Sequence, residues 1–177
     1  FSSLGVTDAR QKSIFGICSF FNYHTEVKTL IVAEDFKKSF FSFYVKELKP
    51  KRKPIYKDGE MYQVYSGPGF DILDFYEVKR IYSKVSHYDY EEFLRELTNM
   101  YDLVLWDLPD MDILDANKEI YFPVIRMLDN VSLIVRGKET NINQVRNLAD
   151  YYSKYQVDIK GVLFDSKKKL PKKKGSS

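Results

Sequence analysis

The 177-residue chain has few of the residues from which disulfide, metal and membrane-spanning structures are built. Its only cysteine, Cys18, leaves no disulfide framework and no cysteine-based zinc site, and its place in an apolar run predicts that it is buried. Neither histidine has a second histidine or a cysteine at ligand spacing. No stretch approaches the roughly 18 apolar residues of a membrane span, and the start of the chain lacks the pattern of an export signal. We therefore expect a cytoplasmic protein of one well-buried domain.

Charge is distributed unevenly along the chain. The net charge of +3 includes six lysines between Lys167 and Lys174, and without them 22 basic and 25 acidic residues leave a net charge of −3. We predict an α/β domain at residues 1–166 and a lysine-rich, disordered tail at residues 167–177. The tail either attracts nucleic-acid phosphates or an anionic membrane surface, or is only a solubilising end. A second basic stretch at residues 49–57 is predicted to be a surface loop.

Residues 100–109, M-Y-D-L-V-L-W-D-L-P, contain the clearest strand signal. The four apolar residues from Leu103 to Trp106 are too few for a helix, show no polar alternation and stop at Asp107. They predict a strand buried on both faces, with Asp107 at its carboxyl end. Ligands of parallel sheets collect at that edge, so Asp107 is a candidate for holding a Mg²⁺-bound water. The alternative is a carboxylate that only caps the following turn.

Apolar patterns along the rest of the chain predict an α/β protein. The second half alternates helix and strand at short intervals, which favours a doubly wound, mostly parallel sheet with helices on both faces. Strands predicted at 13–21 and 28–34 lie too close together for a helical crossover, so they are antiparallel neighbours or lack the crossover helix. Further strands are predicted at 61–65, 131–135 and 159–164, helices at 35–48, 86–100, 116–127 and 143–155, a loop with a short helix at 70–85, and loops at 49–59 and 110–116.

Several of these segments, in this order, resemble those of one known family. Residues 101–109 are similar to its Walker B segment, and residues 131–146 and 157–165 are similar to the strand, turn and helix units that follow. Residues 64–70, V-Y-S-G-P-G-F, resemble the strand and turn that precede the Walker B unit, and residues 12–15 resemble the lysine-led first strand. The family is the ParA/MinD branch of P-loop ATPases, and within it the bacterial tyrosine kinase (BY-kinase) domains that work with capsule and exopolysaccharide export proteins. The resemblance implies a P-loop NTPase-like, three-layer fold.

The segment expected to hold the phosphate loop departs from the family pattern. A Walker A loop needs glycines whose N–H groups cradle phosphates, a lysine, and a hydroxyl for Mg²⁺. Residues 19–29 contain no glycine: Asn22 and Val27 stand at glycine positions, and only Lys28 and Thr29 agree with the pattern. Glu26 would also repel a triphosphate. The Walker A sequence is therefore degenerate in this register.

A second alignment places residues 29–39 on the family's second strand and its Walker A′ segment. Ala33 then replaces the first aspartate and Asp35 keeps the second, while the phosphate loop is missing between Phe21 and Val27. The phosphate site is damaged in either register. Asp165 stands where relatives often carry an asparagine that contacts the base, which weakens nucleotide recognition further.

The resemblance leaves two main functions open. One is a degenerate pseudo-ATPase or pseudokinase, without a cofactor, that acts as a protein-interaction or regulatory module. The other is an active ATPase or tyrosine autokinase using ATP and Mg²⁺, although the tail has no tyrosine cluster of the kind that BY-kinases autophosphorylate. In that case Asp107 positions the Mg²⁺-bound water, Asp35 acts as general base, Lys28 and Thr29 contact phosphate, and Asp165 contacts the base. A sheet protein with an unrelated task, including nucleic-acid binding, is a third interpretation.

The resemblance also implies a protein partner. In this family two subunits often face each other across the nucleotide, and BY-kinases contact a membrane co-polymerase. We therefore expect either a homodimer or binding to the tail of a membrane co-polymerase at the inner face of the membrane.

Overall fold

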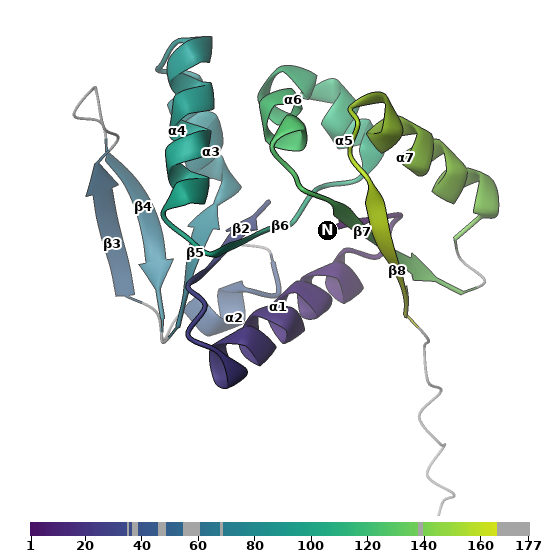
Figure 1. Cartoon of the computed structure of the whole chain (residues 1–177), viewed down its shortest axis with the longest axis horizontal. Helices are drawn as coiled ribbons and strands as arrows, with labels where there is room; N and C mark the ends of the chain where they lie inside the picture. Colours follow the sequence, from purple (N-terminus) through teal and green to yellow (C-terminus); the bar gives the residue numbers. More distant parts are fainter. Residues whose placement is uncertain are drawn as a thin grey trace, which may run out of the picture.

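The computed structural model describes residues 1–34, 36, 39–45, 49–54, 61–67, 69–137 and 140–165. Asp35 and the tail predicted at 167–177 lie outside the described residues. A central sheet carries helices on both faces (Figure 1). The strands are β1 (Ser2–Ser3), β2 (Thr29–Ala33), β3 (Lys49–Pro54), β4 (Met61–Ser66), β5 (Phe70–Asp74), β6 (Leu103–Trp106), β7 (Val131–Arg136) and β8 (Ile159–Asp165). The helices are α1 (Thr7–His24), α2 (Ser42–Val45), α3 (Phe75–Tyr82), α4 (His87–Asn99), α5 (Met111–Ala116), α6 (Lys118–Arg126) and α7 (Ile142–Lys154).

The hydrogen-bonded strands form a five-stranded sheet, in the order β3-β4-β5-β2-β6, and a three-stranded sheet, in the order β1-β7-β8. Phe1 joins them, because its backbone nitrogen donates to the Trp106 carbonyl at 2.8 Å and its carbonyl accepts from the Leu108 N–H at 2.9 Å. β2 is parallel to β5 and β6, and β7 is parallel to β1 and β8, whereas β3 and β4 form an antiparallel edge. The predicted fold class, a doubly wound and mostly parallel α/β sheet, is confirmed.

Each face of the sheet has its own apolar core. On one face Ile14 and Cys18 of α1 pack against Ile31 and Leu105, and Cys18 is completely buried as predicted. On the other face α3, α4, α6 and α7 cover the sheet (Figure 1) with a larger cluster that includes Trp106. Among the described helices, none combines the length and the apolar character that a membrane span requires.

The strand predicted at 13–21 is wrong, because these residues lie in α1. The buried residues of this helix, Arg10, Gln11, Ile14 and Cys18, recur every three or four positions, which is the helical period. The apolar run concealed that period because Phe20, which is 58% exposed, lies on the outer side of the helix. The segment resembling a lysine-led first strand is part of the same helix. α1 thus supplies the crossover between the parallel strands β1 and β2.

Other local predictions were corrected or confirmed. Residues 49–54 form the edge strand β3 rather than a loop, and residues 111–116 form α5 rather than an acidic loop. Residues 70–74 form β5 ahead of the short helix α3. Of the helix predicted at 35–48, the described residues show only the short α2. The predicted strands at 28–34, 61–65, 103–106, 131–135 and 159–164 and helices at 86–100, 116–127 and 143–155 are confirmed within a few residues.

Candidate functional site

The candidate site lies where the carboxyl ends of β1, β2 and β6 meet. Asp107 directly follows β6, and its N–H donates to the Val32 carbonyl at 2.9 Å, which holds it beside the end of β2. β1 ends at Ser3, and a short loop around Gly5 leads into α1. Gly5 has a φ of +70°, a left-handed conformation that glycine adopts without steric cost. This strand, loop and helix start therefore occupy the edge at which parallel sheets bind ligands.

Asp107 is buried and both of its carboxylate oxygens accept hydrogen bonds from α1. Arg10 Nε donates to Oδ1 at 2.5 Å, and Gln11 Nε2 donates to Oδ2 at 2.9 Å. The Arg10 and Asp107 side chains are 1% and 0% exposed. Gln11 Oε1 in turn accepts from the Phe40 backbone N–H at 2.8 Å. The carboxylate is thus neutralised and fully hydrogen-bonded by residues of this chain, as buried charges need to be.

The rest of the Arg10 guanidinium is surrounded by further acceptors. Nη1 donates to Ser3 Oγ at 3.0 Å, and it lies 3.7 Å from Asp110 Oδ1. Nη2 lies 3.8 Å from Glu34 Oε2. Burial, opposed by the Arg10 charge, raises the pKa of the Glu34 carboxyl to about 7. The Arg10 guanidinium therefore faces three acidic side chains, which balance its positive charge inside the protein.

A cavity of about 410 Å³ lies beside the loop that links β1 to α1. Leu4 and Gly5 form one wall, and Asp110 and Asp112 line it from α5 and the residue before that helix. Gln144 of α7 is also in the lining. The described lining residues include two carboxylates and no lysine or arginine. The two carboxylates disfavour an anionic ligand in this cavity, although the Arg10 guanidinium lies 3.7 Å from Asp110 and offsets part of that charge.

Asp165, at the end of β8, is bound to Arg136 of β7. Arg136 donates to Asp165 Oδ2 from Nε at 2.7 Å, and its Nη2 lies 2.6 Å from the same oxygen. The same Nη2 lies 3.3 Å from Asp8 Oδ1 in the first turn of α1. This network connects the ends of β7 and β8 to the helix that carries Arg10 and Gln11.

Lys28 and Thr29 lie at the amino-terminal end of β2, whereas Asp107 lies beside its carboxyl-terminal end. Lys28 Nζ donates to the Met100 carbonyl at 3.1 Å and lies 4.7 Å from the centre of the Tyr101 ring. Thr29 is buried at the start of β2. β2 extends five residues from Thr29 to Ala33, which is about 16 Å at the usual rise of a strand. The structure therefore brings Asp107 together with Arg10 and Gln11, but not with Lys28 or Thr29.

Metal binding at Asp107 stays a prediction. Among the described residues, no group of three or more histidine, cysteine, aspartate and glutamate side chains is arranged to hold a metal ion. Asp35, the proposed general base, lies outside the described residues.

The sequence interpretation did not identify Ser3, Arg10 and Gln11 as site residues. Because residues 13–21 were predicted to be a strand, the phosphate loop was expected after them, whereas the structure has one helix over these residues, and the loop ahead of that helix contains Gly5. The available signal was local: Gly5 stands just ahead of a helix whose buried positions follow a period of three to four residues. The strand, loop and helix unit is thus present at residues 2–24, with one glycine in its loop.

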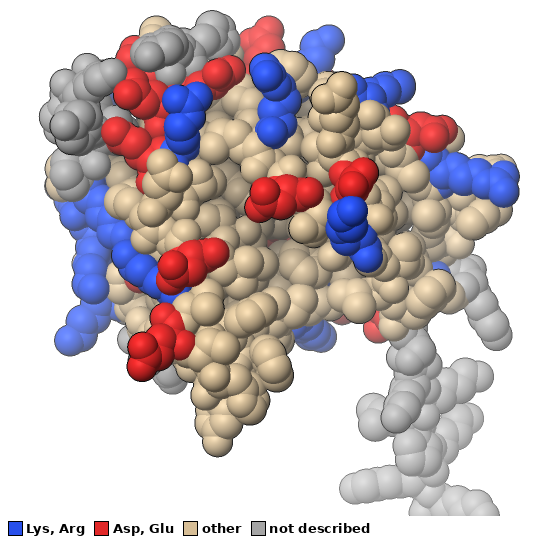
Figure 2. Space-filling view, in the orientation of Figure 1, with Lys and Arg blue, Asp and Glu red and all other residues tan. Residues whose placement is uncertain are grey.

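On the face drawn in Figure 2, the surface charge of the described residues does not form a single basic field. Figure 2 shows acidic and basic side chains interspersed on the visible face, with basic groups gathered along the β3 side. Lys49, Lys51 and Arg52 of that edge strand are exposed. Charged side chains on an edge strand discourage pairing with other strands, so they need no ligand to account for them.

Comparisons with known proteins give a fold. No protein-family model matches the chain, and no curated protein matches it. The kinase domain of VpsO matches with a TM-score of 0.64 and 17% identity, over 94% of this chain and 83% of that one. The BceF tyrosine kinase domain matches with a TM-score of 0.61 and 14% identity, over 93% and 66%. The kinase domain of the Escherichia coli tyrosine kinase ETK has a TM-score of 0.50 and 14% identity, over 95% and 66%. The chain therefore has the fold of bacterial tyrosine kinase domains.

Proposed function

We propose that this chain is a degenerate P-loop-like domain that does not hydrolyse ATP and acts as a protein-interaction or regulatory module in capsule or exopolysaccharide production. The observation that carries the proposal is the occupation of both Asp107 oxygens by Arg10 and Gln11. The pathway rests on the resemblance to BY-kinase domains, and the likeness to the VpsO, BceF and ETK kinase domains supports the fold part of it.

Phosphoryl transfer depends on the positioning of the phosphates and on positive charge around them, and the described residues of this site supply neither. A phosphate loop presents several glycine N–H groups, a lysine that reaches the phosphates, and a hydroxyl that binds Mg²⁺. Near the start of α1 this chain carries Arg10 and Gln11, and its loop has one glycine, Gly5. Arg10 already neutralises Asp107, so this carboxylate is not available to bind a Mg²⁺-bound water. We therefore expect no cofactor.

A nucleotide titration tests the loss of ATP chemistry. Ligand binding to the folded state must raise its stability, by about 2.7 kcal/mol at a concentration 100 times Kd. We expect no change in Tm and no calorimetric heat with millimolar ATP or ADP plus Mg²⁺, and no autophosphorylation. The alternative of an active ATPase or tyrosine autokinase predicts a Tm rise in the native chain that Asp107→Asn abolishes and the exposed control Asp129→Asn retains. That pattern would contradict our proposal.

The surface offers contacts for a protein partner, which we propose to be a second copy or the tail of a membrane co-polymerase. Phe20 and Tyr23, near the end of α1, are 58% and 85% exposed, and both rings contact His24. In Figure 2 the lowest tip of the molecule is tan, with acidic side chains beside it. Exposed apolar clusters of this kind are typical of interaction sites.

Light scattering over a concentration series distinguishes the two partners. A homodimer through the α1 end predicts that Phe20→Ser with Tyr23→Ser weakens self-association at least about tenfold, equivalent to about 1.4 kcal/mol. Tyr76→Ser, which removes a ring that is 66% exposed on α3, is the matched control. A chain that stays monomeric at every concentration contradicts the homodimer and directs the search to membrane-protein tails.

A further inference from the structure

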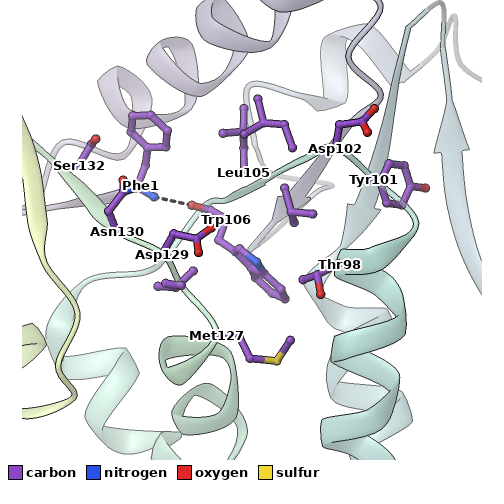
Figure 3. Close-up of a pocket in the computed structure, with 13 residues that line it drawn as sticks. Phe1, Thr98, Tyr101, Asp102, Leu105, Trp106, Met127, Asp129, Asn130 and Ser132 are labelled. Atoms are coloured by element: carbon purple, nitrogen blue, oxygen red, sulfur yellow. Dashed lines mark hydrogen bonds between the residues drawn. The ribbon is translucent and has the colours of Figure 1, made fainter.

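Among the described strands, β3 and β8 are the two edges of the sheet. Between them the Phe1 nitrogen donates to the Trp106 carbonyl (Figure 3), which joins the five-stranded and the three-stranded sheet. The β3 edge presents lysine and arginine side chains to solvent, and its Pro50 has no N–H to donate. Natural proteins use such features to keep an edge strand from pairing with other chains. The β3 edge is therefore protected.

The β8 edge lacks these features over its central residues. Val162 and Leu163 are each 43% exposed, and Phe164 is 77% exposed. Because successive side chains of a strand point to opposite faces, Leu163 lies on one face of the sheet, and Val162 and Phe164 lie on the other. Where Figure 1 draws β8, the surface in Figure 2 is mainly tan. Apolar side chains are thus exposed on both faces of an edge strand.

The backbone hydrogen bonds of β7 show which of its residues face β8. The Val131 N–H donates to the Asp158 carbonyl at 2.9 Å, just ahead of β8. Arg136 instead bonds to Thr140, because its N–H donates to Thr140 Oγ1 at 3.0 Å and its carbonyl accepts from the Thr140 N–H at 2.9 Å. Alternate residues of a strand direct their backbone groups to the same side. Every second residue of β7 from Val131 onward therefore faces β8.

The register of the two strands then identifies the outer edge of β8. Leu133 and Val135 have Val162 and Phe164 as their partners. A residue in a parallel ladder bonds to the residues on either side of its partner, so the N–H and carbonyl groups of Val162 and Phe164 point away from β7. No described strand pairs with that side of β8. The outer edge therefore offers two N–H donors and two carbonyl acceptors beside three exposed apolar side chains.

The charges around this edge indicate what would occupy it. Residues 166–177, which follow β8 in the sequence, contain one apolar residue, Leu170, so their composition does not suit an apolar strand. Antiparallel pairing of two β8 strands would turn the exposed Lys160 of each copy toward the residues that follow β8 in the other, and six lysines follow there in the sequence between Lys167 and Lys174. Like charges placed opposite each other destabilise paired strands. A different apolar segment with acidic residues at both ends would be attracted instead.

We propose that β8 is the docking edge for an extended segment of a partner protein, with apolar residues at its centre and acidic residues at both ends. The inference rests on the protein-interaction role proposed above and names the kind of segment that binds, on a surface separate from the α1 end. The segment adds a strand to the sheet, because its backbone bonds to the outward groups of Val162 and Phe164. Its apolar side chains cover the exposed ones of β8, and its acidic residues complement Lys160 and the lysine-rich sequence after β8.

A synthetic peptide with this pattern, acetyl-Glu-Glu-Val-Ile-Val-Glu-Glu-amide, is titrated into the full chain by isothermal calorimetry. We expect it to bind, and we expect acetyl-Lys-Lys-Val-Ile-Val-Lys-Lys-amide to bind at least about tenfold more weakly. Phe164→Ser should weaken binding of the acidic peptide at least about tenfold, because it removes the most exposed apolar side chain of β8. Tyr76→Ser, which removes a ring that is 66% exposed on α3, is the matched control and should leave the Kd unchanged.

The role of the backbone is tested separately. Val162→Pro removes an outward N–H and no hydrogen bond to β7, so the fold is expected to persist, with Tm as the check, while peptide binding is lost. Hydrogen exchange of the native chain gives a second measurement. The Val162 and Phe164 amides should exchange at least about tenfold more slowly with bound peptide, whereas the Leu163 amide, which already faces β7, should change little.

Several outcomes overturn the proposal. They are no binding at millimolar peptide, equal binding of the basic peptide, binding that Phe164→Ser leaves intact, and unchanged exchange of the Val162 and Phe164 amides. Self-association that Phe164→Ser weakens would assign the edge to a second copy instead. Phe20→Ser with Tyr23→Ser should leave the peptide Kd unchanged, and nucleotide enters none of these measurements. Failure at β8 is therefore distinguishable from failure of the function proposed above.

Discussion

The Arg10 guanidinium and the Asp107 carboxylate form a buried ion pair between residues 97 positions apart, with Nε 2.5 Å from Oδ1. The pair connects the start of α1 to the end of β6, and Gln11 binds the second oxygen of the same carboxylate. These polar groups at the carboxyl end of β6 thereby satisfy one another. This arrangement supports our proposal that the site does not hydrolyse ATP.

Removing one member of this pair should be costly. Arg10→Met leaves Asp107 buried without its cation, and we expect a loss of about 3–5 kcal/mol in the free energy of unfolding. In Arg10→Met combined with Asp107→Leu the unpaired charge is gone, so the double variant should lose much less than the sum of the single ones. Urea denaturation of the native chain and the three variants measures the coupling, expected to be at least about 2 kcal/mol. Additive losses would show that the pair is not coupled.

Glu34 should make stability fall as the pH rises. Its pKa is raised from 4.5 to about 7 mainly by burial, so between these values the folded state binds more protons than the unfolded state. The free energy of unfolding therefore decreases as the pH rises from 4.5 to about 7. Below pH 4.5 the Glu34 carboxyl is protonated in both the folded and the unfolded state. We expect Glu34→Gln to be more stable than the native chain at pH 8, by up to about 3 kcal/mol, and close to it at pH 4.5. The exposed variant Glu91→Gln is the control, and an equal pH dependence of both variants would contradict the assignment.

Cys18 should be unreactive in the folded protein. Its side chain is completely buried, and burial raises the pKa of the thiol to about 12, which suppresses the reactive thiolate. Because this is the only cysteine, a chromogenic disulfide reagent reports on one site. We expect no reaction over hours in buffer and one thiol per chain in guanidinium. Rapid reaction under native conditions would mean that α1 opens readily from the sheet.

Tyr101 should contribute measurably to stability at the amino edge of the sheet. Its hydroxyl donates to Asp71 Oδ2 at 2.6 Å and accepts from Lys53 Nζ at 2.6 Å, so it connects the start of β6 to β5 and β3. Tyr101→Phe is expected to lower the free energy of unfolding by about 1–3 kcal/mol, because two charged groups lose a partner. Tyr76→Phe, which alters an exposed ring, should change it by less than about 0.5 kcal/mol. If Tyr101→Phe and Tyr76→Phe change the free energy of unfolding equally, the Tyr101 hydroxyl has no stabilising role of this kind.

Local sequence patterns were sufficient to predict those helices and strands whose apolar residues show directly which of their sides are buried. Leu103 to Trp106 is a strand with Asp107 at its end because four apolar residues with no polar alternation suit a position covered on both faces. The sequences of α4 and α7 alternate apolar and charged residues with a helical period, and both helices follow their polar amino-terminal caps, Ser86 and Asn141. The helical period of α1 is hidden in the sequence because both the inner and the outer side of this helix are apolar.

The sequence by itself determined that the chain is an α/β sheet protein and that Asp107 lies at the carboxyl end of a buried strand. Those properties depend on hydrophobic period and chain direction, which neighbouring residues encode. Only the tertiary structure decided which side chains meet there. Arg10 reaches Asp107 because β1 lies beside β6, and Lys28 does not because it enters β2 at the opposite edge. Contacts between distant segments follow from strand order, which no local pattern in either segment specifies.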